Sequence, residues 1–512
     1  MHPACFGHGT TMTALARYLP DRQTAASPWF LLVVAILFGG SRYLIPDPIY
    51  YVLTVVSVLL LVSCLLFPMV GLYLYVLVAQ VQQTYYFMDW TKFYDLRVYP
   101  YIPFVIVAGV GLVAYRSVRQ KGIDRRTPLD TLWLFIIVFE GFSLFWAPNL
   151  TFGIYLWCML VVNYISYLLF THLVLDHRQL KLLVSFTLFC GFLGAVSIFG
   201  NLYYDIDKYF YWPNDTGLRA AFTNLYGRPG GWSGPSHLSG FMAATIPIAY
   251  IKFGFAKEGI KKFFYLAIMV FMMGAIVMGE TRGVFISLFG GLFFLLYISP
   301  QYAGKRLFYG FLSVSVIVAT MIFFQPRFIN RILVGFGYTG QLFLEGNKGT
   351  FGSGTEEGQG PEGQSGLTVR IWWFTNVLKA MNKEPLTYLV GPGLSGFQFY
   401  SRGSPEANGL FWGFIADMGV LGLILFIFFV KIVWANTAYY VRKAQHTKSY
   451  YLYLAVLTGF VMDVAIHGLV DFDLNSYGSK NIWLPMGLLM ATMNILRREM
   501  DAEESEKTIP NK

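Results

Sequence analysis

Residues 151–170 read TFGIYLWCMLVVNYISYLLF, a run without a single Asp, Glu, Lys or Arg. A helix of about 20 apolar residues is long enough to cross the hydrocarbon core of a bilayer, which is roughly 30 Å thick. The whole chain agrees with this segment, because 56% of its 512 residues are hydrophobic and only 13% are charged. Soluble domains carry about 25% charged residues. The sequence therefore predicts an integral membrane protein.

Similar apolar runs recur along the chain. They predict an all-α membrane protein with about fourteen transmembrane helices, or at least twelve, because each run is long enough or nearly long enough to span the bilayer. Pro68 is the only break between the second run and the third. The predicted helices lie near residues 28–45, 49–67, 69–84, 101–115, 129–145, 151–170, 180–200, 235–254, 263–279, 283–298, 307–325, 409–434, 451–469 and 482–496.

One long polar stretch, from Pro326 to Asn408, interrupts the apolar runs. Its middle, GNKGTFGSGTEEGQGPEGQSG, has too few apolar residues to bury a core and is predicted to be a linker. Its end, LTVRIWWFTNVLKAMNKEPLTYLVGPGLSGF, mixes aromatic residues with an arginine and a glycine turn, and predicts short amphipathic helices. Long structured loops in compact proteins usually carry function. We expect this end to form a lid over a functional site.

These boundaries divide the chain into five parts. We expect a cytoplasmic N-terminal segment at 1–27, transmembrane helices at 28–325, a long external loop at 326–408, further transmembrane helices at 409–496 and a cytoplasmic tail at 497–512.

The distribution of Lys and Arg predicts the orientation. If the N-terminus is cytoplasmic and the helices alternate, the cytoplasmic segments hold 23 of the 38 basic residues. The outer segments hold 15, and seven of these lie in the long loop, to which the positive-inside rule applies weakly. Both termini are therefore expected in the cytoplasm, and the long loop outside it.

Composition and motifs exclude several classes of function. The net charge of +10 is explained by topology signals and contacts with anionic lipid, so we expect no nucleic-acid partner. The four cysteines are scattered and show no spacing typical of a metal site or a disulfide framework. The GPGLSG sequence from Gly391 matches a nucleotide-binding pattern but lacks the surrounding βαβ unit, and is predicted to be a turn that re-enters the membrane.

Four arginines are predicted on the outer side, at helix ends or in turns. They are Arg219, Arg228, Arg282 and Arg370. The planar guanidinium group is permanently charged and binds phosphate through several donors, although a single arginine at this depth can equally be an interfacial anchor. Together they predict a site for a polyanionic group such as a lipid-linked diphosphate.

The motifs around these arginines resemble the O-antigen ligase and O-antigen polymerase family of bacterial polytopic membrane glycosyltransferases. The resemblance covers about half of the chain, roughly from Arg228 to Leu489. In order, it runs through RPGGWSGPSHLSGFMAATIPIA, GETRGVFISLFGGL, VRIWWFTNVLKAMNKEPLTYLVGPGLSGF, EANGLFWGFIADMGVLGLILF and HGLVDFDLNSYGSKNIWLPMGLL.

The resemblance implies an activity. Members of the family transfer or polymerise a glycan from undecaprenyl diphosphate onto an acceptor hydroxyl at the outer face of the bacterial inner membrane, in lipopolysaccharide or exopolysaccharide biosynthesis. They need no metal and no cofactor. The implied partners are the lipid-linked glycan, a glycan or lipid acceptor, membrane lipids and polysaccharide assembly proteins. Arg370 and Arg282 match the family's catalytic arginines, and Arg228 matches a substrate-binding one. Arg219 and His237 are further candidates for substrate binding.

The sequence offers more than one candidate for the general base. Ligases of the family commonly have a His-Asn pair after the long loop, whereas this chain has Ala407 followed by Asn408. Glu406 is a candidate base, while Asn408 is a candidate for substrate binding or for a helix cap. His467 is another candidate base, and an ordinary hydrogen-bonded histidine is the simpler explanation for it. The missing histidine favours a polymerase or exopolysaccharide role over a ligase.

Two other functions fit the sequence. A flippase or transporter of lipid-linked glycans would gather ionisable residues in mid-membrane, and Asp417 and Asp463 lie inside predicted helices. Such carboxylates need partners in lipid, so a structural pair with an arginine is as good an explanation as catalysis. A non-catalytic scaffold of a polysaccharide assembly complex is consistent with Ala407.

Overall fold

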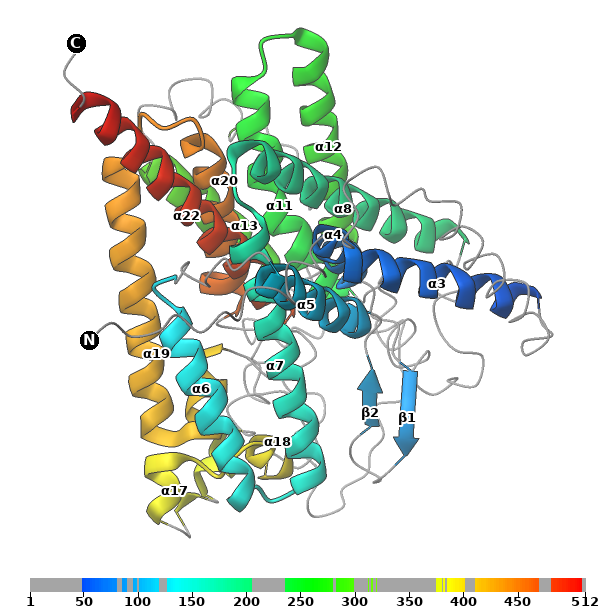
Figure 1. Cartoon of the computed structure of the whole chain (residues 1–512), viewed down its shortest axis with the longest axis vertical. Coiled ribbons are helices and arrows are strands. Elements are labelled where there is room, and N and C mark those ends of the chain that lie inside the picture. Colours follow the sequence, from blue (N-terminus) through cyan, green and yellow to red (C-terminus); the bar gives the residue numbers. More distant parts are fainter. Residues whose placement is uncertain are drawn as a thin grey trace, which may run out of the picture.

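The computed structural model is predominantly helical (Figure 1). It describes residues 48–80, 85–89, 95–98, 101–118, 127–204, 235–279, 282–298, 374–379, 381–382, 385–400, 410–468 and 480–508, together with positions 312, 315 and 319.

Most predicted apolar runs within these ranges form helices. The helices are α3 (Pro48–Leu66), α4 (Pro68–Val78), α5 (Tyr101–Val118), α6 (Asp130–Ser143), α7 (Leu150–Leu173), α8 (His177–Tyr204), α11 (Pro235–Phe255), α12 (Gly259–Met278), α13 (Arg282–Ile298), α17 (Pro385–Val390), α18 (Gly396–Tyr400), α19 (Leu410–Lys443), α20 (Tyr450–Phe460) and α22 (Lys480–Thr508). A short 3₁₀ turn, η2 (Leu144–Trp146), follows α6, and a π-helix, η5 (Val461–His467), continues α20.

Within the described part of the chain, six helices are long and apolar enough to cross a membrane. They are Leu150–Leu173, His177–Gly200, His237–Phe255, Gly259–Met278, Leu410–Lys443 and Tyr450–His467. Four shorter apolar helices accompany them, at Val55–Leu66, Pro68–Val78, Tyr101–Ser117 and Gly283–Ile298. The chain thus has the helices of a membrane protein, while the count of fourteen spans stays a prediction. The spans predicted at 28–45 and 307–325 lie outside the described ranges, apart from the three isolated positions.

The described chain is all-α as predicted, apart from one short hairpin. Strand β1 (Tyr85–Asp89) pairs antiparallel with β2 (Asp95–Val98), between α4 and α5. Tyr and Phe favour extended backbone, and the YYFMD sequence of β1 is rich in both. This hairpin lies in the connection between the runs predicted at 69–84 and 101–115.

The span predicted at 409–434 is one of the six candidate spans, and it contains a break that hydropathy did not predict. Gly419 lies within α19 and has φ 61° and ψ −141°, which breaks the helix with a sharp kink. Residues with a side chain rarely adopt a positive φ, so glycine is needed here. The kink leaves a short first segment, about 14 Å long at 1.5 Å per residue, before the main helix begins. Figure 1 shows the main part of α19 running along the long axis of the molecule.

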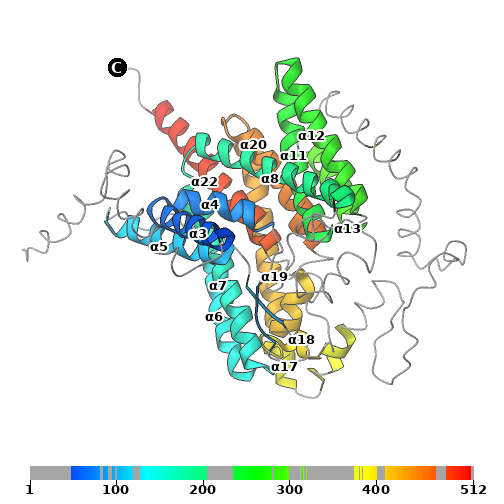
Figure 2. The same cartoon turned by 90° about the vertical axis from the view of Figure 1, so that its right-hand side faces the viewer.

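Helix α11 is the centre of the packing and touches α8, α12, α13, α20, η5 and α22. Figure 2 shows it among these elements. Small residues allow the close approaches, since a side chain at Gly459 of α20 would collide with the backbone of Ala244, and one at Gly194 of α8 would collide with Leu238. Helices in lipid associate mainly through such packing of small residues.

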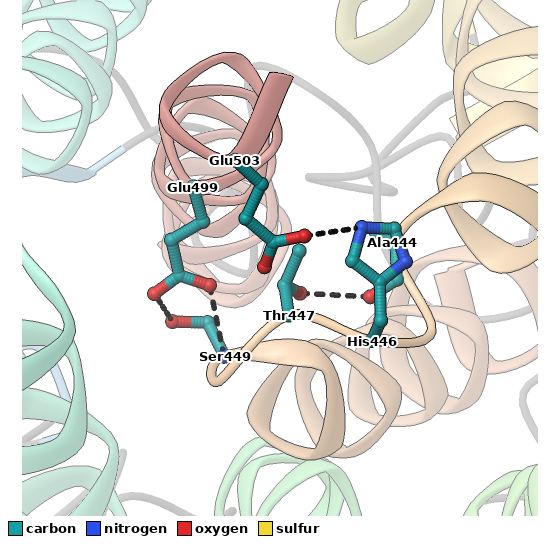
Figure 3. Close-up of polar contacts among 6 residues, drawn as sticks. All are labelled: Ala444, His446, Thr447, Ser449, Glu499 and Glu503. Atoms are coloured by element: carbon teal, nitrogen blue, oxygen red, sulfur yellow. Dashed lines mark hydrogen bonds and ion pairs between the residues drawn. The ribbon is translucent and has the colours of Figure 1, made fainter. Parts of the chain in front are cut away.

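The turns α7–α8, α11–α12 and α19–α20 meet at one end of this bundle. His177 Nδ1 lies 2.9 Å from Ser449 Oγ, and the rings of Phe255 and Tyr451 are 5.3 Å apart. Glu499 of α22 accepts hydrogen bonds from the backbone N–H and the hydroxyl of Ser449, at 3.0 and 2.7 Å (Figure 3). These turns were all predicted to be cytoplasmic, and we call this end the inner end.

Candidate functional site

The π-helix η5 carries two ionisable side chains that face each other. His467 Nδ1 lies 3.4 Å from Oδ1 of Asp463, and both side chains are fully buried. The π-helical hydrogen bond, from Gly468 N–H to the carbonyl oxygen of Asp463, widens this turn. π-helical turns are rare and occur frequently at functional sites. A buried ionisable pair inside a candidate span is costly in lipid and indicates function.

Helix α11 holds this pair in place through Gly240. A Cβ atom at Gly240 would lie 2.7 Å from both Cε1 and Nδ1 of His467, and 3.0 Å from Oδ1 of Asp463. Glycine is therefore required for α11 to contact the pair directly. His237, which the sequence proposed for substrate binding, lies one helical turn before Gly240 on the same helix.

Helix α13 packs closely on η5 in a similar way. A side chain at Gly290 would meet Ile466, and one at Gly291 would meet Met462. These glycines belong to the GETRGVFISLFGGL motif on which the family resemblance partly rests. Their part in this structure is to let α13 and η5 approach closely.

Several helix ends gather near the pair. Gly279, just after α12, packs against Ser239 of α11, because a Cβ atom at Gly279 would lie 2.7 Å from the Ser239 hydroxyl. Arg282 begins α13 three residues later. The start of α11 and the start of α13 are therefore at the same end of the bundle as the end of η5. Helix N-termini present free N–H groups and partial positive charge, which favour bound anions.

This arrangement suits acid–base chemistry next to an anion. A carboxylate next to one ring nitrogen of a histidine orients the ring and stabilises the imidazolium form, so that the other nitrogen can accept a proton from a substrate. Asp463 is placed to do this for His467. Its second oxygen, Oδ2, is buried and has no hydrogen-bond partner among the described residues. A group arriving at the site therefore meets an unsatisfied acceptor.

The described end of the long loop docks elsewhere, on the corner between α6 and α7. Leu394 N–H donates to Ser143 Oγ at 3.0 Å, and Ser395 Oγ donates to the carbonyl oxygen of Asn149 at 3.1 Å. Trp146 Nε1–H donates to the carbonyl oxygen of Gly391 at 3.2 Å. Figure 1 shows α17 and α18 at the lower end of the molecule, beside α6 and α7.

The loop turn also fits against the kink of α19. Gly391 and Gly393 have φ values of 76° and 81°. A Cβ atom at Gly391 would overlap the carbonyl group of Asp417, and one at Gly419 would overlap that of Tyr388. The GPGLSG sequence is therefore a tightly packed turn between helices, and no nucleotide-binding unit surrounds it in the described part of the chain.

Most of the predicted site lies outside the described residues. These positions are Arg219, Arg228, Arg370, Glu406, Ala407 and Asn408. The backbone of Arg282 is described as the first residue of α13, and its side chain lies outside the description. The lid predicted over the site also stays a prediction, because the described loop end contacts the α6–α7 corner and α19.

The sequence predicted His467 and His237 as separate site residues and missed the contact between His467 and Asp463. The expected arginine partner of Asp463 is instead His467, four residues later on the same turn. The D-x-x-x-H spacing was the signal available, since residues four apart in a helix are neighbours. No group of three or more His, Cys, Asp or Glu side chains within the described ranges is arranged to hold a metal ion.

Comparison with known proteins adds no assignment. No protein-family model matches the chain, and no curated protein matches it.

Proposed function

We propose that this protein is a membrane glycosyltransferase of the bacterial inner membrane. It would transfer or polymerise a glycan carried by undecaprenyl diphosphate onto an acceptor hydroxyl at the outer face, with both termini in the cytoplasm. The observation that carries the proposal is the buried Asp463–His467 pair on a π-helix, at the end of the bundle where α11 and α13 begin. The sequence resemblance supplies the substrate class.

In the proposed reaction, the acceptor oxygen attacks the anomeric carbon of the donor glycan. His467 takes the proton of the hydroxyl, and Asp463 stabilises the resulting imidazolium group. The bond between the anomeric carbon and the diphosphate oxygen breaks, and its electrons stay on that oxygen. The leaving group is therefore the lipid diphosphate. Negative charge grows on this leaving group in the transition state, so fixed positive groups accelerate the step.

The positive groups would come from both the backbone and arginine side chains. The N-termini of α11 and α13 offer N–H groups, and Arg282 opens α13. Arg370, Arg228 and Arg219 would complete the clamp around the diphosphate. His237 and Asn408 would bind the glycan or acceptor, and Glu406 is a second candidate base.

One observation favours a flippase as the second candidate function. The Asp463–His467 pair is fully buried within a candidate span, as expected for a proton relay that drives transport. The two functions differ in where the precursor accumulates when the protein is inactivated. A flippase defect leaves the lipid-linked glycan facing the cytoplasm, and a transferase defect leaves it at the outer face.

The test uses His467→Ala, Asp463→Asn and Arg282→Ala in cells and in purified protein supplied with lipid-linked donor. Loss of one general base typically slows a reaction by about 10²- to 10⁴-fold, so polymerised or transferred glycan should almost disappear for His467→Ala. The matched control is His446→Ala, since His446 is an exposed histidine at the inner end. Normal glycan production by all three variants, while each is inserted and folded, contradicts the proposal.

Two other outcomes would each favour a different function. Precursor facing the cytoplasm in the variants would assign the flippase function. No product in the purified reaction even from the unmodified protein, combined with loss of product in cells lacking the protein, would indicate a scaffold of an assembly complex.

A further inference from the structure

A polar cavity of about 530 Å³ lies near the inner end, between the start of α6 and the helices α19 and α22. Its polar walls include Asn436 and Tyr439 from α19, and Asn494, Arg497 and Asp501 from α22. It is separate from the Asp463–His467 pair, and none of these residues has a role in the proposed reaction.

The cavity presents two opposite charges that bind each other only loosely. Arg497 Nε and Asp501 Oδ2 are 3.9 Å apart, beyond the usual length of a hydrogen bond, and the two side chains are 70% and 69% exposed. An exposed pair of this kind contributes little to stability. Both charged groups therefore keep the capacity to bind a ligand.

A buried amide adds an unsatisfied donor to the same wall. Asn494 Nδ2 is buried and has no hydrogen-bond partner among the described residues. Leaving a buried donor unpaired costs about 1–3 kcal/mol, and rotation of the Asn494 side chain toward the cavity would let a bound acceptor relieve this cost. Across the cavity, Asn436 Nδ2 donates to the carbonyl oxygen of Ile432 at 2.8 Å, which leaves the carbonyl oxygen of Asn436 as an acceptor.

The surroundings of the cavity match the edge of a bilayer. Trp434 and Tyr439 on α19 are 67% and 51% exposed. Aromatic side chains of this kind concentrate at the level of lipid headgroups. Helix α19 ends nearby with the basic residues Arg442 and Lys443, and the apolar part of α22 ends at Leu496. A ligand in this cavity would therefore come from the membrane interface.

We infer that the cavity binds the headgroup of a phospholipid that carries a phosphate and a primary ammonium group. Arg497 and the Asn494 amide bind the phosphate. Asp501 and the carbonyl oxygen of Asn436 accept hydrogen bonds from the ammonium. An anionic headgroup without an amine would place its phosphate near Asp501 without compensation, and a quaternary amine could not donate hydrogen bonds to these acceptors.

The full-length protein in nanodiscs tests this inference. The discs contain phosphatidylglycerol with an equal share of phosphatidylethanolamine or phosphatidylcholine, and native mass spectrometry counts the lipids retained after partial delipidation. Phosphatidylethanolamine should be retained about tenfold over phosphatidylcholine, as expected for one charge-assisted hydrogen bond. Asp501→Asn should reduce this preference to about threefold or less, because it removes the charged acceptor of the ammonium group. Arg497→Gln should instead lower the retention of both lipids by about threefold, because both carry the phosphate that Arg497 binds.

The matched controls are Arg442→Gln on α19 and Glu506→Gln on α22, which remove exposed charges away from the cavity walls. Both should retain phosphatidylethanolamine like the unmodified protein. Equal retention of the three lipids would overturn the inference, and so would a preference for phosphatidylglycerol. An unchanged preference in Asp501→Asn, or unchanged retention of both lipids in Arg497→Gln, would also overturn it, provided that the variants elute and unfold like the unmodified protein.

Discussion

Replacing Gly240 by alanine is expected to disturb the Asp463–His467 pair directly. The new methyl group would lie 2.7 Å from two atoms of the His467 ring, whereas non-bonded carbon atoms normally approach to about 3.5–4.0 Å. The ring would have to move by about 1 Å, and a displacement of this size at a catalytic group can reduce the rate about 100-fold. We therefore expect glycan product to fall by about two orders of magnitude.

The expected change in stability is smaller. Overpacking a core typically costs about 1–3 kcal/mol, and alanine in place of a helical glycine recovers about 0.5–1 kcal/mol. The net loss is then between about 0 and about 2.5 kcal/mol, so the variant should still fold and insert.

The assay compares product formation and thermal unfolding in detergent for Gly240→Ala and Gly259→Ala. Gly259 begins α12, and a Cβ atom there would meet nothing within 4 Å, so this control carries the same chemical change without the collision. If Gly240→Ala forms product at the rate of the control, the pair at Gly240 is not the reaction centre. If its unfolding temperature also equals that of the control, the packing described for α11 and η5 is wrong.

Three further predictions concern the fold, and thermal unfolding measures each of them. Gly391→Ala should destabilise the loop turn and the kink of α19. Left-handed backbone costs alanine about 1–2 kcal/mol, and the methyl group would overlap the carbonyl of Asp417. An unfolding temperature equal to that of the unmodified protein would contradict the contact between the loop turn and α19. Glu499→Gln should lower the free energy of unfolding by about 1–2 kcal/mol, since it weakens two hydrogen bonds from Ser449 to a charged acceptor. If Glu499→Gln costs the same in a protein that already carries Ser449→Ala, the two residues act independently. Trp483→Ala should cost about 3–5 kcal/mol, because this side chain is fully buried; a loss below 1 kcal/mol would show that α22 is packed differently.

Apolar runs were the most informative part of the sequence. The run at 151–170 became α7, and Pro68 separates α3 from α4 as its position suggested. Hydropathy could not reveal the kink at Gly419, because the residues on both sides of it are equally apolar. The strand Tyr85–Asp89 was missed because short segments are ambiguous without their pairing partner.

The site was predictable only in its parts. Asp463 was recognised as a carboxylate that needs a partner in lipid, and His467 as a candidate base, but their contact depends on a π-helical turn that the sequence alone does not reveal. Gly240, Gly290 and Gly291 were seen within motifs, while their function as contact points depends on which helices become neighbours. Such neighbours are set by tertiary packing, which local residue patterns do not encode.

The central position of α11 has a consequence for biogenesis. Helices α8, α12 and α13 are synthesised close to it in time, but α20 and η5 follow roughly 200 residues later. Until they leave the ribosome, the surface of α11 around Gly240 and Ala244 faces lipid or the insertion machinery. A chain that stops before Tyr450 therefore leaves this face of α11 without the helices that pack on it. Synthesis of about the last eighth of the chain, from Tyr450 onward, therefore completes the packing around α11.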